Sequence, residues 1–213
     1  MKKKKTILAA VVLLLVAVVG GAIAYFTDTD SKTNTFTIGN VDITLTEDAW
    51  DALADTNNND IPDLAEDMMP GESVTKDPTI NNVSTKNPAF VFAKVEVPCT
   101  TETTPQEIFT YTPNAGWTEL TTANLPVACT SGGTATHVYY YGTSGTLTAL
   151  AKAADSSTPT ATTNPVFSSV TLRSTLKGNE GLTGNKNIVV TGYGIQTEGL
   201  TSTAPADVWS NFS

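Results

Sequence analysis

The chain has 213 residues, of which 40% are hydrophobic and 15% are charged, and its formal net charge is −9. This acidic balance argues against nucleic acids and anionic lipid surfaces as partners, because like charges repel. Residues 25–213 are enough for a single domain with a hydrophobic core.

The first 24 residues have the three parts of an export signal. Residues 2–5 are all lysine, and the run from Ile7 to Ala24 has no charge. Ala22 and Ala24 then form the small-x-small pattern that a signal peptidase recognises, with Tyr25 next. We expect cleavage after Ala24 and therefore a secreted protein. The alternative is an uncleaved membrane anchor, because the apolar run to Phe26 is 20 residues long.

Cleavage would make the protein more acidic. The chain has 12 Lys and Arg and 21 Asp and Glu, and the signal carries four of the lysines and no acid. The exported part therefore has 8 basic and 21 acidic residues and a formal charge of −13. Such a surface can attract divalent cations.

Beyond the signal, apolar and polar residues alternate with period two, as in half-buried strands. The alternation starts in Phe36–Ile38 and Val41–Leu45, with a turn or bulge at Gly39-Asn40 between them. It recurs in five later segments: Ser73–Val83, Ala89–Val97, His137–Tyr141, Val166–Leu172 and Asn187–Gln196. Many short strands with frequent Gly, Pro and Asn turns predict an all-β sandwich or barrel.

Little helix is expected. Glu47–Ala54 and Pro205–Phe212 could each form a short helix, and Leu147–Ala154 fits either a short helix or a strand. Residues 155–164 have the composition of a flexible surface loop.

Residues 47–67 form an acidic loop with eight Asp and Glu and no Lys or Arg. Like charges at this density repel one another unless a cation or water screens them. Within the loop, oxygen ligands occur at the positions of a 12-residue calcium site: Asp55, Asn57, Asn59, Ile61 (through its carbonyl), Asp63 and Glu66. Asp60 stands where glycine usually makes the sharp turn, and Asp tolerates left-handed backbone better than most residues. We expect Ca²⁺ as a cofactor here; the alternative is a solvated acidic loop.

Cys99 and Cys129 are the two cysteines, and His137 is the one histidine. In an exported protein the cysteines can form a disulfide, although two unpaired thiols remain an alternative because sequence does not place the Cβ atoms. A catalytic zinc needs about three protein ligands. The sequence has no His-Glu-x-x-His and no Gly-x-Ser-x-Gly motif, so it predicts no catalytic residues and no enzyme.

Three segments carry a family resemblance: Ala24–Ile43 (AYFTDTDSKTNTFTIGNVDI), Met69–Asn82 (MPGESVTKDPTINN) and Tyr193–Gly199 (YGIQTEG). They resemble the TasA/camelysin family of Gram-positive bacteria, secreted proteins released by a SipW-type signal peptidase. The resemblance is strong through residue 98, weaker from 99 to 165, and recovers near the end. It implies a jelly-roll sandwich over residues 25–213 and assembly into biofilm fibres by donor-strand exchange. The name camelysin also carries a metalloprotease label, which this sequence supports little.

Residues 25–35 are the predicted donor strand. From Tyr25 to Asn34 the chain is polar except for Tyr25 and Phe26 at its tip, and it has nothing local to pair with. An extended end can add to the open edge of a neighbour's sheet, where its aromatic side chains fill pockets. Such head-to-tail contacts make filaments unless they close. The alternative is a disordered tail, the default for a chain terminus.

Three functional hypotheses follow. The main one is a secreted structural subunit of extracellular biofilm-matrix or cell-surface fibres. Its partners would be copies of itself, the SipW-type signal peptidase and other matrix or anchoring proteins, but no nucleic acid. The second is a calcium-dependent monomeric module that binds a surface ligand or glycan. The third is a camelysin-type secreted metalloprotease, which would have to use His137.

Overall fold

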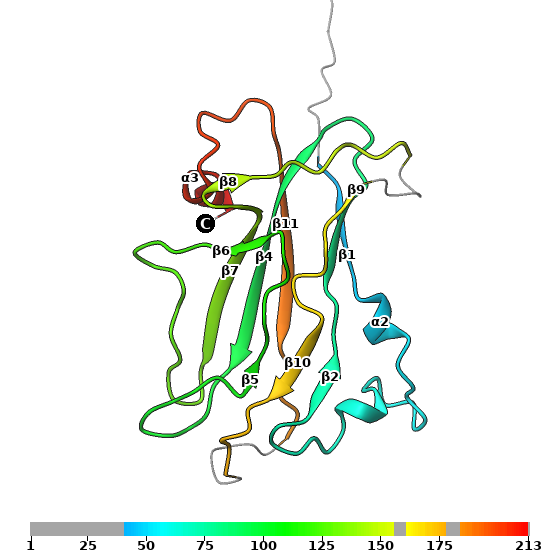
Figure 1. Ribbon diagram of the computed structural model, residues 1–213, viewed down its shortest axis with the longest axis vertical. Helices are drawn as coiled ribbons and strands as arrows, with labels where there is room; N and C mark the ends of the chain where they lie inside the picture. Colours follow the sequence, from blue (N-terminus) through cyan, green and yellow to red (C-terminus); the bar gives the residue numbers. More distant parts are fainter. Residues whose placement is uncertain (1–40, 156–160, 178–183, 213) are drawn as a thin grey trace, which may run out of the picture. The chain divides into compact units, whose positions relative to one another are not determined.

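The computed structural model describes residues 41–155, 161–177 and 184–212. The predicted signal peptide 1–24 and the predicted donor strand 25–35 lie outside the described residues, together with Ala22, Ala24, Tyr25 and Phe26. The described chain consists mainly of antiparallel strands with two short α-helices (Figure 1), which confirms the all-β, sandwich-like class.

The strands fall into three antiparallel sheets, and three short strands (β5, β6 and β9) were not expected from the sequence. The first sheet has the order β1 (Ile43–Thr46), β3 (Thr79–Asn82), β9 (Ala161–Thr162). The second has the order β2 (Ser73–Thr75), β10 (Ser169–Leu172), β5 (Phe109–Thr110). The third has the order β11 (Val189–Gln196), β4 (Ala89–Pro98), β7 (Thr134–Thr143), β6 (Trp117–Glu119), and β8 (Thr146–Leu147) also pairs with β7.

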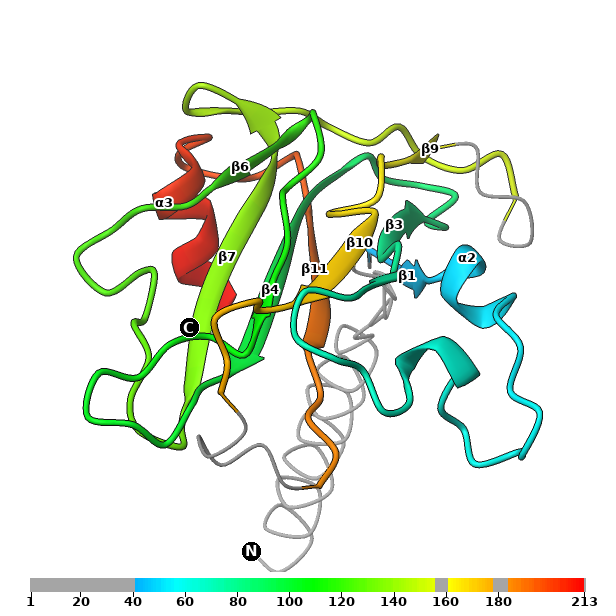
Figure 2. The ribbon, with the colours of Figure 1, turned by 60° about the horizontal axis from the view of Figure 1, so that its bottom comes forward.

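The strand β4 is central to the five-stranded sheet. Phe92 pairs with Tyr193 of β11 on one side and with Tyr140 of β7 on the other. Strands β7, β4 and β11 therefore run side by side (Figure 2). The period-two pattern of Ala89–Val97 correctly predicted this strand.

One face of the five-stranded sheet packs against the two smaller sheets. Val91 and Val95 point from β4 into a core that also contains Ile80 of β3 and Val170 of β10, and all four are buried. Because successive side chains of a strand point to opposite faces, the intervening residues of β4 face away from this core. The layers thus follow from the alternation in the sequence.

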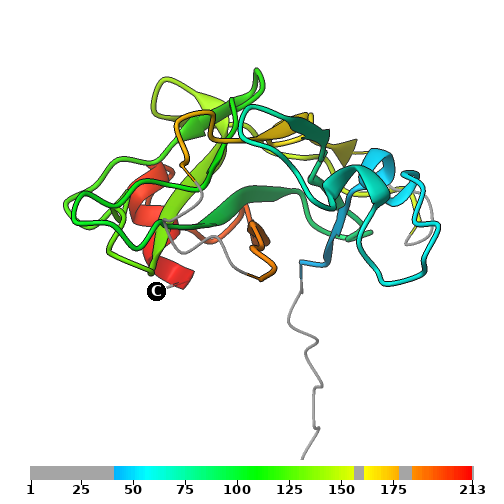
Figure 3. The ribbon, with the colours of Figure 1, turned by 90° about the horizontal axis from the view of Figure 1, so that it is seen from below.

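The opposite face of β4 packs against the C-terminal helical segments α3 (Pro205–Trp209) and η2 (Ser210–Phe212). The ring of Phe92 lies 5.5 Å from Trp209 and 5.8 Å from Phe212, measured between centroids. Figure 3 shows α3 and β10 with β4 between them. The helix predicted over Pro205–Phe212 is confirmed as these two short segments.

The single strand predicted over Ser73–Val83 is wrong, because β2 and β3 are separate strands in different sheets. Pro78 lies between them and has no N–H for a ladder. The carboxylate of Asp77 is also occupied, since it accepts hydrogen bonds from the amides of Ala49 (3.0 Å) and Trp50 (3.1 Å). Those amides begin α2 (Asp48–Asp51), which is shorter than the predicted helix Glu47–Ala54.

The surface loop predicted over residues 155–164 is wrong at its end. Ala161 and Thr163 are buried, and β9 pairs with β3 through Asn82 and Asn81. The ambiguous segment Leu147–Ala154 contributes its first residue to β8. No helix in the described part of the chain is long and apolar enough to span a membrane.

Candidate functional site

The acidic loop folds around the carboxylate of Asp55. Its Oδ1 accepts hydrogen bonds from the main-chain amides of Asn58 (2.8 Å) and Asn59 (3.3 Å), and its Oδ2 accepts one from Asp60 (3.0 Å). Asn58 and Asp60 have φ values of 59° and 65°. The sharp turn therefore occurs in the left-handed region without glycine, which Asn and Asp tolerate.

The side chain of Glu66 closes the loop. The Nδ2 atoms of Asn57 and Asn59 both donate to its carboxylate, the first at 2.9 Å. The main-chain amide of Ile61 donates to Asn59 Oδ1 (2.9 Å). Asp63 Oδ1 accepts a hydrogen bond from the amide of Thr56 (2.9 Å) within the same loop.

The structure thus brings the six predicted calcium ligands into one hydrogen-bonded loop that includes η1 (Asp63–Ala65). Amide N–H groups face the carboxylates in this arrangement. Across residues 41–155, 161–177 and 184–212, no group of three or more His, Cys, Asp or Glu side chains is placed to hold a metal ion.

His137 of β7 lies between two glutamates. Its Nδ1 is 2.7 Å from Glu119 Oε1 at the end of β6, and its Nε2 is 3.0 Å from Glu107 Oε1. Both ring nitrogens can donate only in the charged imidazolium. The hydrogen bond to Glu107 raises the pKa of His137 above its ordinary value, and Glu119 adds to this, while burial acts in the opposite direction.

Two tyrosines pack beside this histidine. The hydroxyl groups of Tyr111 and Tyr139 are 3.1 Å apart, and the ring of Tyr139 stacks on His137 with a centroid distance of 6.3 Å. Burial raises the pKa of Tyr139 to about 12, and burial also raises the pKa of Tyr111 well above its ordinary value. Both phenols are therefore neutral hydrogen-bonding groups at neutral pH.

The residues that a zinc site would use do not fit zinc. A histidine ligand needs a free ring lone pair about 2.0–2.1 Å from the metal, but both nitrogens of His137 bind carboxylates on opposite edges of the ring. Cys99 and Cys129 are joined in a disulfide with an S–S distance of 2.09 Å and a Cα–Cα distance of 5.7 Å. Neither cysteine therefore supplies a thiolate.

The disulfide lies in the same part of the fold as His137 and its two glutamate partners. Cys99, just after β4, forms an isolated bridge with Glu107, and Val127 forms one with Thr136 of β7. The pairs Cys99–Cys129 and His137–Glu107 thus fasten two long connections to the end of the five-stranded sheet.

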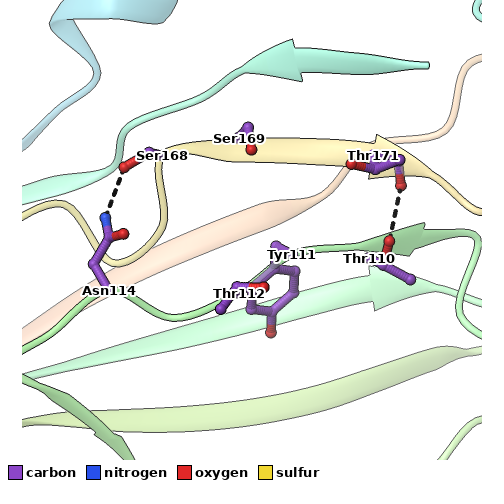
Figure 4. Close-up of a pocket in the computed structure, with 7 residues that line it drawn as sticks. All are labelled: Thr110, Tyr111, Thr112, Asn114, Ser168, Ser169 and Thr171. Carbon is purple, nitrogen blue, oxygen red and sulfur yellow. Dashed lines mark hydrogen bonds between the residues drawn. The ribbon is translucent and has the colours of Figure 1, made fainter. Parts of the chain in front are cut away.

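A polar cavity of about 260 Å³ lies where β5 and β10 separate (Figure 4). It is lined by Thr110, Tyr111, Thr112, Asn114, Ser168, Ser169 and Thr171. Asn114 donates to Ser168 Oγ (2.8 Å) at one end, and Thr110 Oγ1 donates to the carbonyl of Thr171 (3.4 Å) at the other. The lining has hydroxyl and amide groups but no carboxylate, thiol or imidazole, so it contains no acid–base pair.

The strand β11 lies at the margin of the five-stranded sheet, with β1 near it (Figure 1). Two glycines of β11 allow the close approach. An ideal Cβ at Gly194 would lie 2.8 Å from Ile43 Cγ2 and 3.2 Å from Val41 Cγ1, and one at Gly192 would lie 3.2 Å from Ile80 Cδ1. Val41, the first described residue, therefore lies beside β11.

These features define an all-β, sandwich-like protein with one disulfide between its described cysteines. Residues 1–104 match the model of the family described as camelysin metallo-endopeptidase. The match confirms the TasA/camelysin resemblance over this part of the chain. No curated protein and no solved structure matches the sequence.

Sequence reasoning missed Glu107 and Glu119 as partners of His137. They are 30 and 18 residues away along the chain. No local spacing indicates such a contact, because it depends on where β6 and the β4–β5 connection meet β7. The place of β11 at the margin of the five-stranded sheet was also missed, since strand order is not visible in a period-two pattern.

Proposed function

We propose that the protein is a secreted structural subunit that assembles into extracellular fibres, with residues 25–35 of one copy adding a strand to the sheet of another. The observation that carries the proposal is the junction at Val41. Val41, the first described residue, lies against Gly194 of β11, which is the outermost described strand of the five-stranded sheet. Strand addition supplies affinity through main-chain hydrogen bonds.

Cleavage by a SipW-type signal peptidase belongs to the same proposal, because it would free Tyr25 and Phe26 as the tip of the donor strand. The family match over residues 1–104 supports it, since that part of the chain contains both the signal and the donor segment. Other matrix or anchoring proteins would be additional partners at the ends of a fibre.

The proposal assigns no proteolytic role to the chain despite the family's label. Its support is the chemistry of the ligand candidates: His137 is bound at both nitrogens, and the cysteines are joined. Cleavage of casein by the purified protein, abolished by a chelator and by His137→Ala, would contradict this assignment.

The test of assembly compares two purified proteins, the chain beginning at Tyr25 and the same chain without residues 25–35. Electron microscopy should show filaments for the first and dispersed particles for the second. Circular dichroism and the intact Cys99–Cys129 disulfide would show that the shortened chain is folded. Undiminished filaments from the shortened chain would exclude donor-strand assembly.

We also propose that the acidic loop binds Ca²⁺. Asn57 and Asn59 point their amide groups at Glu66, so rotation of each amide by half a turn would direct its oxygen toward that carboxylate. A cation bound between these oxygens would take the place of the amide N–H groups as the partner of the Glu66 carboxylate. It would also relieve the repulsion between Asp55, Asp63 and Glu66. If the protein instead stays monomeric and binds a surface ligand only with calcium, the alternative hypothesis of a calcium-dependent binding module would replace the fibre subunit.

A further inference from the structure

We propose that the polar cavity between β5 and β10 binds one unit of a neutral saccharide. The site goes beyond the proposed function, because its residues belong neither to the donor segment nor to the acidic loop. The proposal rests on an opening in the sheet at this place, on the hydroxyl groups around the opening and on the uncharged character of the lining.

The cavity is an interruption in the pairing of β10 with the chain that contains β5. Thr171 of β10 pairs with Thr110, where β5 ends. The two chains meet again where the amide of Asn114 donates to the carbonyl of Val166 (2.9 Å). The volume of about 260 Å³ lies between these two contacts. It is therefore a gap within the sheet that is closed at both ends.

The main chains of Ser169 and Thr112 face each other across the gap. The amide of Arg173 donates to the carbonyl of Ile108 (2.9 Å), so the main chains of these two residues are directed toward each other. Because main-chain groups alternate in direction along a strand, Ser169 and Thr112, further along the same two chains, have the same orientation. No main-chain hydrogen bond joins them. Main-chain groups in this position need a partner from water or from a ligand.

The side chains of the same two residues add hydroxyl groups to the gap. Figure 4 shows Ser169 and Thr112 between its two ends. Both residues are exposed, and neither side chain makes a hydrogen bond within the described chain. Each hydroxyl offers one donor and two acceptor lone pairs. A ligand in the gap therefore meets donors and acceptors from both sides.

Hydroxyl groups continue beyond the gap over the outer face of this sheet. Val74 and Val170 are buried, and successive side chains of a strand point to opposite faces. The residues next to these valines in β2 and β10 therefore face outward, and all of them carry hydroxyl groups: Ser73, Thr75, Ser169 and Thr171.

The lining is uncharged although the chain is rich in charge. The chain has 12 Lys and Arg and 21 Asp and Glu, but none of the seven lining residues is ionisable at neutral pH except through the neutral phenol of Tyr111. Strands β2, β5 and β10 read SVT, FT and SVTL. An ionic ligand would lose water here without gaining a charged partner. The hydroxyl groups of a sugar both donate and accept, so a neutral saccharide matches this lining.

The walls of the cavity are held in place from outside it. The ring of Tyr111 lies 4.6 Å from the ring of the buried Phe167, and its hydroxyl is 3.1 Å from that of Tyr139. Asn114 donates to the carbonyl of Pro165 (3.0 Å) and to Ser168 Oγ (2.8 Å). These contacts order the site before a ligand arrives, which lowers the entropic cost of binding.

The size of the cavity limits the ligand to a single ring. Pockets for drug-sized ligands have about 300–1,000 Å³, and this cavity of about 260 Å³ is smaller. Its lining includes the exposed residues Thr112, Ser168 and Ser169, so it opens to solvent. One ring of a polysaccharide can therefore enter while its neighbours stay outside. For a ligand of this size we expect a dissociation constant of about 1–10 mM.

The test measures sugar binding by saturation-transfer difference NMR. This method detects the protons of the sugar, so it applies to the chain that begins at Tyr25 whether that chain is monomeric or assembled. The neutral probes are glucose, galactose and N-acetylglucosamine. Glucuronate is the matched anionic probe, because it differs from glucose by a carboxylate.

Two variants locate the site. Thr112→Val with Ser169→Ala removes both hydroxyl groups from the gap at exposed positions, and valine keeps the shape of threonine. Thr143→Val is the control, because it makes the same change at an exposed position at the end of β7. If the double variant does not fold, Thr112→Val alone decides the result.

We expect saturable binding of at least one neutral probe and none of glucuronate. The double variant should bind that probe at least about tenfold more weakly, since it loses two hydrogen-bonding groups, and Thr143→Val should bind it as the unchanged chain does. Absence of saturable binding by all three neutral probes, or unchanged binding by the double variant, would overturn the proposal. Glucuronate binding as tight as that of the neutral probes would contradict the neutral ligand class. None of these outcomes depends on whether filaments form.

Discussion

The side chain of Ile43 occupies the space that a β-carbon would need at Gly194, since an ideal Cβ there would lie 2.8 Å from Ile43 Cγ2. This methyl group is attached to a branched Cβ and cannot move without a change in χ1 or in the backbone. The contact explains why β11 carries glycine at a position where most strands have a side chain.

Gly194→Ala should therefore lower the free energy of unfolding by about 1–2 kcal/mol, because overpacking outweighs the smaller entropy of the unfolded chain. Gly192→Ala is the matched control. Its Cβ would meet Ile80 Cδ1 at 3.2 Å, the flexible end of a side chain, and its effect should stay within about 0.5 kcal/mol. Urea unfolding of both variants checks the difference, and equal effects would contradict the contact. Ile43→Ala removes the Cγ2 methyl group, so the double variant Ile43→Ala with Gly194→Ala should lose less stability than the sum of the two single effects.

The stability of the protein should depend on pH through His137. The native pKa is raised above the unfolded value, chiefly by the hydrogen bond to Glu107. The stabilisation is therefore complete below the unfolded pKa of about 6.5 and is lost as the pH rises through the raised native pKa. His137→Gln should cost about 1.5–3 kcal/mol near pH 6, and less as the pH increases. Urea unfolding over a pH series measures the difference between the two proteins. A difference that stays constant between mildly acidic and alkaline pH would contradict the charged pairing.

Removal of the disulfide should destabilise the domain. Cys99 and Cys129 are 30 residues apart in sequence, and opening a loop of this size costs about 3–4 kcal/mol in the chain-entropy model. The double substitution Cys99→Ala with Cys129→Ala should lower the midpoint of thermal unfolding, and a reductant should have the same effect on the unchanged protein. An unchanged midpoint in both cases would show that the bond contributes nothing to stability.

Calcium binding to the acidic loop predicts heat on titration of the metal-free protein with millimolar CaCl₂. Asp55→Ala should abolish this heat, because Asp55 is the first of the proposed ligands and also accepts hydrogen bonds from the amides of Asn58 and Asp60. Asp51→Ala removes one acid from α2 outside the ligand set and should leave the heat unchanged. No heat in the unchanged protein, or heat that survives Asp55→Ala, would remove the site.

The period-two pattern predicted the long strands because part of each alternates between two faces of the sheet, as in the buried Val95 and Val97 of β4 on either side of the partly exposed Glu96. Segments Ala89–Val97 and Asn187–Gln196 match β4 and β11 to within two residues at each end. The short strands β5, β6 and β9 were not predictable, because they are too short to show a period. Their positions depend on pairing with distant strands, as in the register of β5 against Leu172 of β10.

The candidate sites also differ in how far the sequence could predict them. The ligand order of residues 55–66 is local, so the sequence could predict which side chains would meet in the acidic loop. The surroundings of His137 are not local, because Glu107 and Glu119 come from separate connections that only the sheet order brings together. The place of β11 at the margin of the described sheet likewise depends on the strand order.

Amide hydrogen exchange along β11 tests the central claim most directly. In the dilute protein, the amides of Gly192 and Gly194 should exchange rapidly. The amide of Thr197 faces β4, main-chain groups alternate along a strand, and no described strand pairs with the other side of β11. The amides of Thr191 and Tyr193 should be protected by β4. In filaments of the chain that begins at Tyr25, we expect all four to be protected. Rapid exchange at Gly192 and Gly194 in filaments, or protection of these two amides already in the monomer, would contradict addition of a neighbour's strand to this edge.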